Sequence, residues 1–257
     1  MFANDSPIIE VRNLSKNYGE IQAVTDLSFA VQPGEILGLV GANGAGKTSA
    51  LRTITGILRP SAGSIRVAGH DIEREPVAAK RAFAYIPDTI HAYDLLTVTE
   101  HLHFIALAYR VPDAEAKYAD LLDELELTSK RDEIASSLSR GMLQKLSLAC
   151  AFLREPRVII LDEPLTGLDP RGIRNIKESI RRRAARGTAF LLSSHLLVLV
   201  EALCDRVLIL HRGRKMTLGS LEEIRDRATL HREASLEDVF FAVTESANKA
   251  RELSEVT

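Results

Sequence analysis

The sequence lacks tryptophan, and only two of its 257 residues are cysteines, Cys150 and Cys204. Two cysteines within apolar helical patterns cannot build the disulfide framework of a small secreted domain, so we expect structural thiols in a reducing compartment. Long apolar runs are also missing. The most apolar stretches, VIIL at 158–161 and LLVLV at 196–200, fall far short of the roughly 18 residues that a membrane span needs. The N-terminal MFANDSPIIEV has no basic start or apolar run of a signal peptide. We therefore expect a chain that stays in water and is not exported.

Charge of one sign is not in excess either. The 33 basic and 35 acidic residues leave a formal net charge of −2, which gives no global attraction to nucleic acid or anionic lipid. One segment, RGIRNIKESIRRRAAR at 171–186, is strongly basic. We interpret it as an outer helix whose charges face solvent, in preference to a nucleic-acid surface, and we expect no nucleic-acid partner.

What is present is an alternation of strand and helix patterns with enough apolar residues, 46%, for a sizeable core. Strand patterns occur at 8–15, 23–31, 35–40, 64–69 and 82–87, and again in RVIILDEP, TAFLLSS and DRVLIL. Between about 96 and 154 the period is helical, with Thr97 and Glu100 forming a predicted capping box. The tail after about 220 is polar and helical. Strands that alternate with helices predict a mainly parallel sheet covered by helices, with a helical insert.

The glycine-rich loop GANGAGKT at 41–48 satisfies the pattern G-x-x-x-x-G-K-[ST] between an apolar strand and a helix. Successive backbone N–H groups can curl around a phosphate there, Lys47 can reach the β- and γ-phosphates, and the Thr48 hydroxyl can ligate Mg²⁺. We therefore predict nucleotide binding. The residues expected to contact the nucleotide from this segment are Gly41, Ala42, Asn43, Gly44, Ala45, Gly46, Lys47, Thr48 and Ser49.

A second motif, VIILDEP at 158–164, ends a buried strand with two carboxylates. Its position predicts that Asp162 reaches the Mg²⁺ beside the phosphate loop. Glu163 follows immediately and is placed to polarise a water for attack on the γ-phosphate as a general base. A buried salt bridge is the alternative for this acidic pair.

A third feature is the segment SLSRGMLQKL at 137–146, which opens a helix with Ser139, Arg140 and Gly141. The N-terminal end of a helix attracts anions, so this end is a second candidate phosphate site. A plain helix cap at Ser139 is the alternative, and the two roles are compatible.

The run LSRGMLQKLSLACAFLREPRVIILDEPLTGLDP, residues 138–170, resembles the ATPase subunits of ABC transporters, and the resemblance extends over about 8–219. It implies an α/β fold: a P-loop NTPase core with a mainly parallel sheet, an N-terminal antiparallel β subdomain and an inserted α-helical subdomain. The implied division is a core of residues 1–95 and 155–219, a helical signature subdomain of 96–154, and a C-terminal helical tail of 220–257. The implied ligands are ATP and Mg²⁺.

The resemblance also implies that each nucleotide site is a composite site, built from residues of two chains. Ser139 and Gly141 match the signature that covers the γ-phosphate of a nucleotide held by the other subunit, and Asp169 matches the loop residue that links the two sites. A second ATPase subunit would then bind head to tail, and a homodimer is favoured over a heterodimer because one chain carries every expected element.

Two further residues gain a role by the same resemblance. Tyr18, in KNYGE, matches an aromatic residue that stacks on adenine, although a tyrosine near a strand end often only packs. His195, in LLSSHLL, matches a histidine that contacts the γ-phosphate, although a lone histidine is usually structural. With Glu163 and Lys47, His195 completes the predicted catalytic set.

Some positions depart from the family pattern. Asp88 stands where glutamine is common, and its shorter carboxylate can still ligate Mg²⁺, so the predicted metal ligands are Thr48, Asp88 and Asp162. In the signature, Arg140 replaces a usual glycine and Met142 a usual glutamine. These departures, and the SLEDVF segment at 235–240, resemble the export-type branch that handles drugs, lipids or polymers.

The resemblance implies that residues 91–107 line, in their first half, a groove for a short helix of a transmembrane permease subunit, although an ordinary core is the alternative. We therefore expect an ATPase that powers substrate movement, in the export direction, from the cytoplasmic face of the membrane. A soluble ABC ATPase acting on ribosomes or DNA is the alternative. If the chain were a small phosphate-loop kinase or GTPase, the signature and His195 would have no function.

Overall fold

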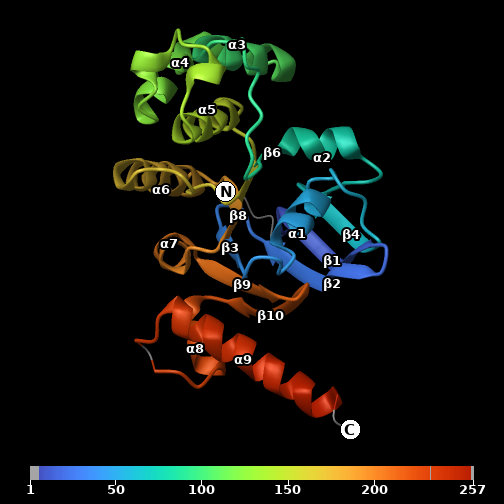
Figure 1. Cartoon of the computed structure of the whole chain (residues 1–257). Coiled ribbons are helices and arrows are strands. Elements are labelled where there is room, and N and C mark those ends of the chain that lie inside the picture. Colours follow the sequence, from blue (N-terminus) through green and yellow to red (C-terminus); the bar gives the residue numbers. More distant parts are fainter. Residues whose placement is uncertain (1–5, 232, 256–257) are drawn as a thin grey trace.

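The structure is a computed structural model that describes residues 6–231 and 233–255, with side chains to residue 245. Two sheets form its centre (Figure 1). The first is antiparallel, in the order β2-β1-β4-β5, where β1 is Ile9–Tyr18, β2 is Ile21–Val31, β4 is Ala62–Val67 and β5 is His70–Asp71. The second is mainly parallel, in the order β10-β9-β3-β8-β7-β6. Its members are β3 (Ile36–Val40), β6 (Phe83–Ile86), β7 (Val158–Asp162), β8 (Ala189–Ser194), β9 (Arg206–His211) and the antiparallel edge strand β10 (Arg214–Gly219).

The parallel strands are buried on both faces because each face has its own core. In β3, Ile36 and Val40 belong to the core on the side of the helical segment, whereas Leu37 and Leu39 belong to the core shared with the antiparallel sheet and α1 (Lys47–Ile54). Side chains alternate between the faces of a strand, so a strand between two cores reads as a continuous apolar run. This explains the runs EILGLV and RVIIL, and it brings the carboxyl ends of β3, β7 and β8 to one edge of the sheet.

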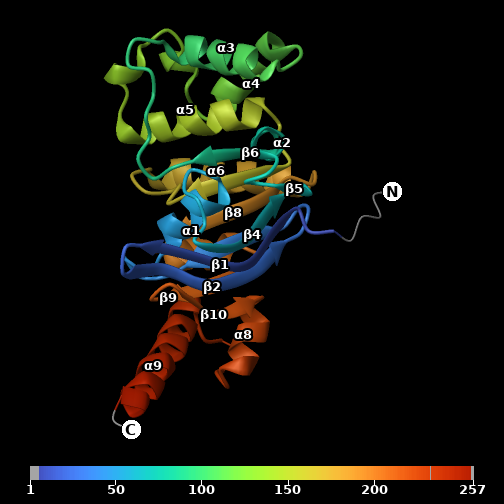
Figure 2. The same ribbon diagram turned by 90° about the vertical axis from the view of Figure 1, so that its right-hand side faces the viewer.

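The helical segment consists of α3 (Val98–Tyr109), α4 (Ala114–Glu124) and α5 (Arg140–Leu153), which pack on one another and lie together at one end of the molecule (Figures 1 and 2). Short 3-10 turns at Thr128–Lys130 and Ala135–Ser137 connect α4 to α5. The predicted capping box of α3 is confirmed: the Thr97 hydroxyl accepts from the backbone N–H of Glu100, and the Glu100 carboxylate accepts from that of Thr97.

The remaining helices cover the sheet and the opposite end. They are α2 (Pro76–Ala82), α6 (Pro170–Ala184), α7 (Leu197–Leu203), α8 (Leu221–Arg227) and α9 (Leu236–Glu255). Helix α9 packs on α7 and β10 and lies at the end of the molecule opposite α3 and α4 (Figure 1). None of the helices in the described part of the chain has the length and apolar character needed to cross a bilayer.

An ion-pair cluster joins the helical segment to α6. The Glu124 carboxylate of α4 accepts hydrogen bonds from Arg183 at 2.6 and 3.0 Å and from Arg182 at 2.9 Å. The guanidinium of Arg183 also stacks on Phe152 of α5, 3.6 Å from the ring centre. Burial alone would raise the pKa of Glu124, but hydrogen bonds from Arg183 and Ser179 and the charges of both arginines hold it at about 2. With Glu124 ionised, the cluster connects α4, α5 and α6.

Glu124→Gln should therefore lower the free energy of unfolding at pH 7 by about 2 kcal/mol, the scale of a lost charged hydrogen bond in a partly buried site. A depressed folded-state pKa stabilises above the unfolded value near 4.5 and loses its effect as pH falls toward 2. In urea unfolding, the difference between mutant and wild type should be full at pH 7 and smaller at pH values below about 4.5. Glu178→Gln, which removes an exposed pair with Arg174, is the control and should change little. An equal Glu124→Gln effect at both pH values would contradict the assignment.

Candidate nucleotide site

The phosphate loop, residues 41–48, connects β3 directly to α1. Gly46 precedes the first helical residue at φ 103°, and no side chain caps this end of the helix. A Cβ on Gly41 would lie 2.5 Å from the carbonyl oxygen of Leu210 and 2.8 Å from Cβ of Ala45, so the loop packs against β9 too closely for a larger residue. The N-terminal end of α1, which as a helix start attracts anions, thus has no side-chain cap.

Lys47 folds back over this loop. Its ammonium donates to the carbonyl oxygen of Gly41 at 2.7 Å and to that of Ala42 at 3.3 Å, and it lies 3.8 Å from Oε1 of Glu163. The side chain is only 8% exposed, so its charge is held inside the loop by neutral carbonyls and one carboxylate. A phosphate oxygen is a stronger acceptor for this charge than a carbonyl oxygen.

Asp162 ends β7 fully buried beside the loop. Its Oδ1 accepts a 2.5 Å hydrogen bond from the Ser193 hydroxyl, whereas Oδ2 is buried and has no hydrogen-bond partner within the described part of the chain. Burial raises the pKa of Asp162; the hydroxyls of Ser193 and Thr48 act against this, and the charges of Asp88 and Glu163 raise it further. A buried, unpartnered carboxylate oxygen among other carboxylates favours a cation close by.

The residues around Asp162 fit Mg²⁺. This ion binds protein through one or two carboxylates and completes its octahedron with water and phosphate oxygens. Thr48 and Asp88 both act on the Asp162 carboxylate, and Oδ1 of Asp88 already accepts from the backbone N–H of Thr89 at 2.7 Å. Within residues 6–231 and 233–245, no three His, Cys, Asp or Glu side chains form a group able to hold a metal.

Glu163 has a positive φ of 51°, a conformation that costs energy for a non-glycine residue. Two contacts with Ser193 hold it, because the Glu163 N–H donates to the carbonyl oxygen at 3.2 Å and to the hydroxyl at 3.1 Å. Oε2 lies 2.9 Å from Nδ1 of His195 and accepts from the His195 backbone N–H at 3.3 Å. Since a carboxylate only accepts, Nδ1 carries the proton and Nε2 is left for another partner.

Ser193 is the site residue that sequence reasoning missed. Its hydroxyl donates to the Asp162 carboxylate and accepts from the backbone N–H of Glu163, so it connects the side chain of one acid to the backbone of the next. The signal was the Ser-Ser pair just before His195 at the end of a strand pattern, which places a hydroxyl next to the acidic strand in a parallel sheet.

Tyr18 ends β1 near the start of α1. Its hydroxyl lies 3.4 Å from the Ser49 hydroxyl, and the Lys16 ammonium lies 5.2 Å from the ring centre. The residue is 45% exposed, so a ring face is available close to the phosphate loop. Stacking of Tyr18 on adenine stays a prediction.

The signature residues lie apart from the phosphate loop of their own chain. Ser139 is exposed and caps α5, accepting from the Met142 N–H at 3.3 Å. A Cβ on Gly141 would lie 3.0 Å from the carbonyl oxygen of Gly167, so the signature packs against the loop that leads to Asp169, the cap of α6. In the part of the chain that the structure describes, no hydrogen bond or ion pair connects Ser139 to residues 41–48. The structure thus brings Lys47, Glu163 and His195 together beside Asp162, whereas the contacts of Ser139, Gly141 and Asp169 in the described residues are with α5, α6 and the loop between β7 and α6.

A groove of about 300 Å³ lies between the end of β6, the following loop, α3 and α5. Its walls include Tyr93 and Phe104, which pack edge to face at 5.0 Å and are 57% and 42% exposed. His101 anchors the loop, because Nδ1 donates to the carbonyl oxygen of Thr97 at 2.8 Å and Nε2 accepts from the Tyr93 N–H at 3.0 Å. The groove presents aromatic side chains, with Tyr93 in the first half of residues 91–107 and Phe104 in the second, and its lining extends to β6 and α5.

The fold and this site define a phosphate-loop nucleoside triphosphatase with an antiparallel sheet and an inserted helical segment. Comparison with known proteins then gives the family. The profile described as "ABC transporter" matches residues 24–166. The chain is 35% identical over 239 residues to the ABC-type transporter ATP-binding protein EcsA of Bacillus subtilis, covering 92% of this chain and 96% of that protein. It belongs to the ATP-binding proteins of ABC transporters.

Other relatives agree with this assignment. The chain is 40% identical over 214 residues to the Nod factor export ATP-binding protein I of Paraburkholderia xenovorans, covering 82% of this chain and 70% of that protein. It is 38% identical over 229 residues to human phospholipid-transporting ATPase ABCA7, covering 88% of this chain but only 11% of that longer protein. A solved structure titled "Structure of ATP binding subunit of ABC transporter" superposes with a TM-score of 0.88 at 38% identity, over 92% of this chain and 99% of that one.

The comparisons confirm the predicted fold class and family, and with them the ATP-binding domain. Both cysteines are free and partly buried, as expected for structural thiols. Burial raises the pKa of the Cys150 thiol to about 12, which keeps it in the unreactive protonated form.

Proposed function

We propose that this chain is the ATP-hydrolysing subunit of an exporter and drives a separate transmembrane protein from the cytoplasmic face of the membrane. The observation that carries the proposal is the convergence of Lys47, Glu163 and His195 at the carboxyl ends of parallel strands, beside an uncapped phosphate loop. This arrangement supports the proposal because Glu163, Lys47 and His195 would then act as base, cation and polar donor around a γ-phosphate.

Each residue of the cluster has a distinct task in the proposed mechanism. Lys47 would neutralise the charge of the phosphates, and Glu163 would accept a proton from the attacking water. His195 holds the Glu163 carboxylate through Nδ1 and would present Nε2 to the γ-phosphate. Thr48, Asp88 and Asp162 would hold Mg²⁺, which supplies charge neutralisation on the phosphate oxygens when bound.

The site would be completed by a second copy of the chain. Ser139 and Gly141 sit at an exposed helix start that makes no hydrogen bond or ion pair with residues 41–48 in the described structure, and Asp169 lies on the adjoining loop. Head-to-tail pairing would bring this surface over the nucleotide of the partner copy. We favour a homodimer because one chain contains both halves of the composite site.

The groove lined by Tyr93 and Phe104 would receive a short helix of the membrane partner. Aromatic walls of this kind bind the apolar face of a helix. We propose the same three-part division as the sequence does, with the helical subdomain at 96–154 inserted into the core of 1–95 and 155–219 and the tail at 220–257. Rotation of the helical subdomain would transmit nucleotide binding and hydrolysis to the groove.

Export is supported by the names of two relatives, a Nod factor export protein and a phospholipid-transporting ATPase. The rival, an ABC ATPase that acts on ribosomes or DNA, would need a basic surface, and α6 is the strongest candidate. Its arginines are largely engaged: Arg182 and Arg183 bind Glu124, Arg174 binds Glu178, and Arg171 binds Glu126. The surface thus has fewer available cations than its sequence suggests.

Affinity purification of the chain from detergent-solubilised membranes tests the proposal. A multi-span membrane protein should be recovered in stoichiometric amount, and Tyr93→Ala combined with Phe104→Ala should lower its recovery about tenfold or more because central aromatic anchors dominate such interfaces. Leu107→Ala, an exposed apolar residue of the same helix outside the groove, is the control. Recovery of ribosomes or DNA in place of a membrane protein would favour the rival.

A further inference from the structure

Three arginines line one hollow of about 470 Å³ where the ends of α2, α3 and α5 meet: Arg81, Arg110 and Arg154. None of them forms an ion pair with any acid in residues 6–231 and 233–245. The other charged groups of the hollow, Lys117 and Glu155, are paired with each other at 3.2 Å. The hollow therefore carries uncompensated positive charge in a protein whose net charge is −2.

Arg154 is the most constrained of the three. Its guanidinium stacks on Tyr109, 3.5 Å from the ring centre, and donates to the carbonyl oxygen of Phe83 at 2.9 Å. Burial lowers the pKa of Arg154, and no carboxylate offsets this effect. A partly buried guanidinium normally has a carboxylate partner, and Arg154 has none among the described residues. Its remaining N–H donors are therefore available to an acceptor from another molecule.

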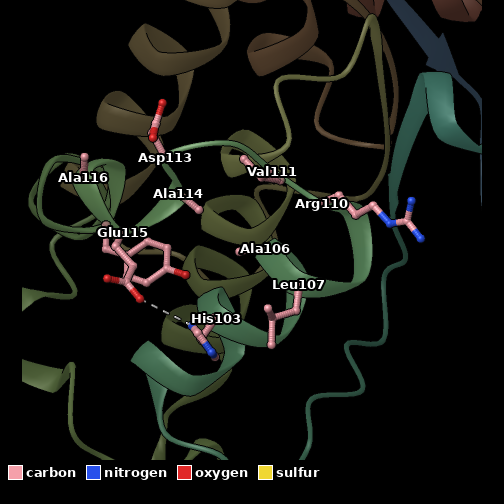
Figure 3. Close-up of a pocket in the computed structure, with 10 residues that line it drawn as sticks. His103, Ala106, Leu107, Arg110, Val111, Asp113, Ala114, Glu115 and Ala116 are labelled. Atoms are coloured by element: carbon pink, nitrogen blue, oxygen red, sulfur yellow. Dashed lines mark ion pairs between the residues drawn. The ribbon is translucent and has the colours of Figure 1, made fainter.

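The hollow adjoins the apolar groove, because Tyr109 and Arg154 line both. On its other side lies a separate cavity of about 540 Å³ at the tip of α3 and α4 (Figure 3). There Asp113 and Glu115 are among the lining residues, with Glu115 paired to His103 at 3.9 Å, while the side chain of Arg110 extends away from them (Figure 3). The positive charge thus accumulates on the groove side.

We infer that this hollow binds an Asp or Glu side chain carried by the segment that docks in the groove. The inference rests on the proposed function and adds the chemistry of the partner: an apolar helix face for Tyr93 and Phe104, and a carboxylate at the end that points toward Arg154. The planar guanidinium, held by its stack on Tyr109, offers two parallel N–H donors to a planar carboxylate. Arg81 and Arg110 strengthen the attraction from the rim.

A broad anionic membrane surface fits this region less well. Acidic residues border the hollow on both sides, with Asp113 and Glu115 in the tip cavity and Asp120 in a neighbouring depression that also contains Lys117 and Glu155. These acids would repel an extended negative surface, whereas a single carboxylate inserted into the hollow meets the three arginines and the Lys117–Glu155 pair, which has no net charge. A local directed contact is therefore favoured over adsorption to lipid.

The test uses the complex of the full chain with the membrane protein that is recovered with it. A photo-crosslinking residue replaces Ala108, which lines the hollow, or Phe104, which lines the groove. Cross-links from position 108 should map within one helical turn of an Asp or Glu of the membrane protein. Arg154→Gln should lower recovery of that protein about tenfold, as should Gln at the mapped acid, and the double variant should show little further loss. Arg214→Gln, an exposed arginine on β10 that has no ion pair among the described residues, is the control.

The outcomes separate the inference from the proposed function. Cross-links from position 104 to the membrane protein, with no acid near the site reached from position 108 or with no effect of Arg154→Gln, overturn the inference and leave the proposed function standing. Cross-links from position 108 to lipid also overturn it. If neither position reaches a membrane protein, the inference and the proposed function fall together.

Discussion

Glu163→Gln should lower ATP turnover by about 100-fold or more, the scale of a lost general base, while ATP affinity changes by only a few fold. The reason lies in the geometry. Among the described residues, Glu163 contacts the phosphate loop only through the 3.8 Å approach of its carboxylate to Lys47, and its Oε2 is held by His195. The substitution therefore mainly removes the ability of this side chain to accept a proton. Glutamine keeps the size of the side chain and can still accept from the His195 backbone N–H.

Phosphate release and binding of a fluorescent ATP analogue measure the two effects separately. The mutant should also accumulate as an ATP-bound dimer on gel filtration, because closure no longer ends in hydrolysis. Glu115→Gln, an exposed carboxylate at the far tip of the helical segment, is the control. Near-normal phosphate release by Glu163→Gln would remove Glu163 from the role of base and leave His195 as the next candidate.

The strands of the core were predictable because two-sided burial gives continuous apolar runs. EILGLV, RVIIL and TAFLLSS sit in β3, β7 and β8, and the motifs that follow these runs converge because parallel strands end at one edge of the sheet. Helix α3 was predictable for another reason: its capping box is a local signal that tertiary packing did not override.

Other elements gave weaker signals. Strand β10, RKMTLG, is an exposed antiparallel edge strand with charged residues, and its sequence has no apolar run that would mark it. Helices α2 and α7 are only seven residues long each, too short for a helical period to be read with assurance. These elements owe their form to contacts with neighbours distant in sequence.

Within the site, residue types and spacing indicated Lys47, Asp162 and Glu163, but not how they are held. The Ser193 hydroxyl that joins the Asp162 carboxylate to the Glu163 backbone, and the stack of Arg154 on Tyr109, depend on which strand or helix lies next to which. Asp162 and Ser193 are 31 positions apart in the sequence and meet because β7 pairs with β8. Spacing along the chain carries no such information.

Ser139→Asp should abolish hydrolysis while leaving the fold intact. Aspartate caps a helix as well as serine does, so α5 should keep its start, but the carboxylate places a negative charge where the proposed dimer would place a γ-phosphate. We expect turnover to fall by about 100-fold or more, the scale of losing one stabilising donor at a reacting phosphate. Ser139→Asn, an equally good cap without charge, is the matched control and should retain much more activity.

Mixing variants tests whether Ser139 acts on the nucleotide of its own chain or on that of its partner. A Lys47→Ala chain has a defective phosphate loop and an intact signature, and a Ser139→Asp chain has the reverse. In a head-to-tail dimer of one of each, one composite site combines both defects and the other has none. An equal mixture of the two inactive proteins should therefore recover about a quarter of wild-type phosphate release, since half the dimers are mixed and half of their sites are intact. If each site lay within one chain, every site would carry a defect and the mixture would stay as inactive as its components.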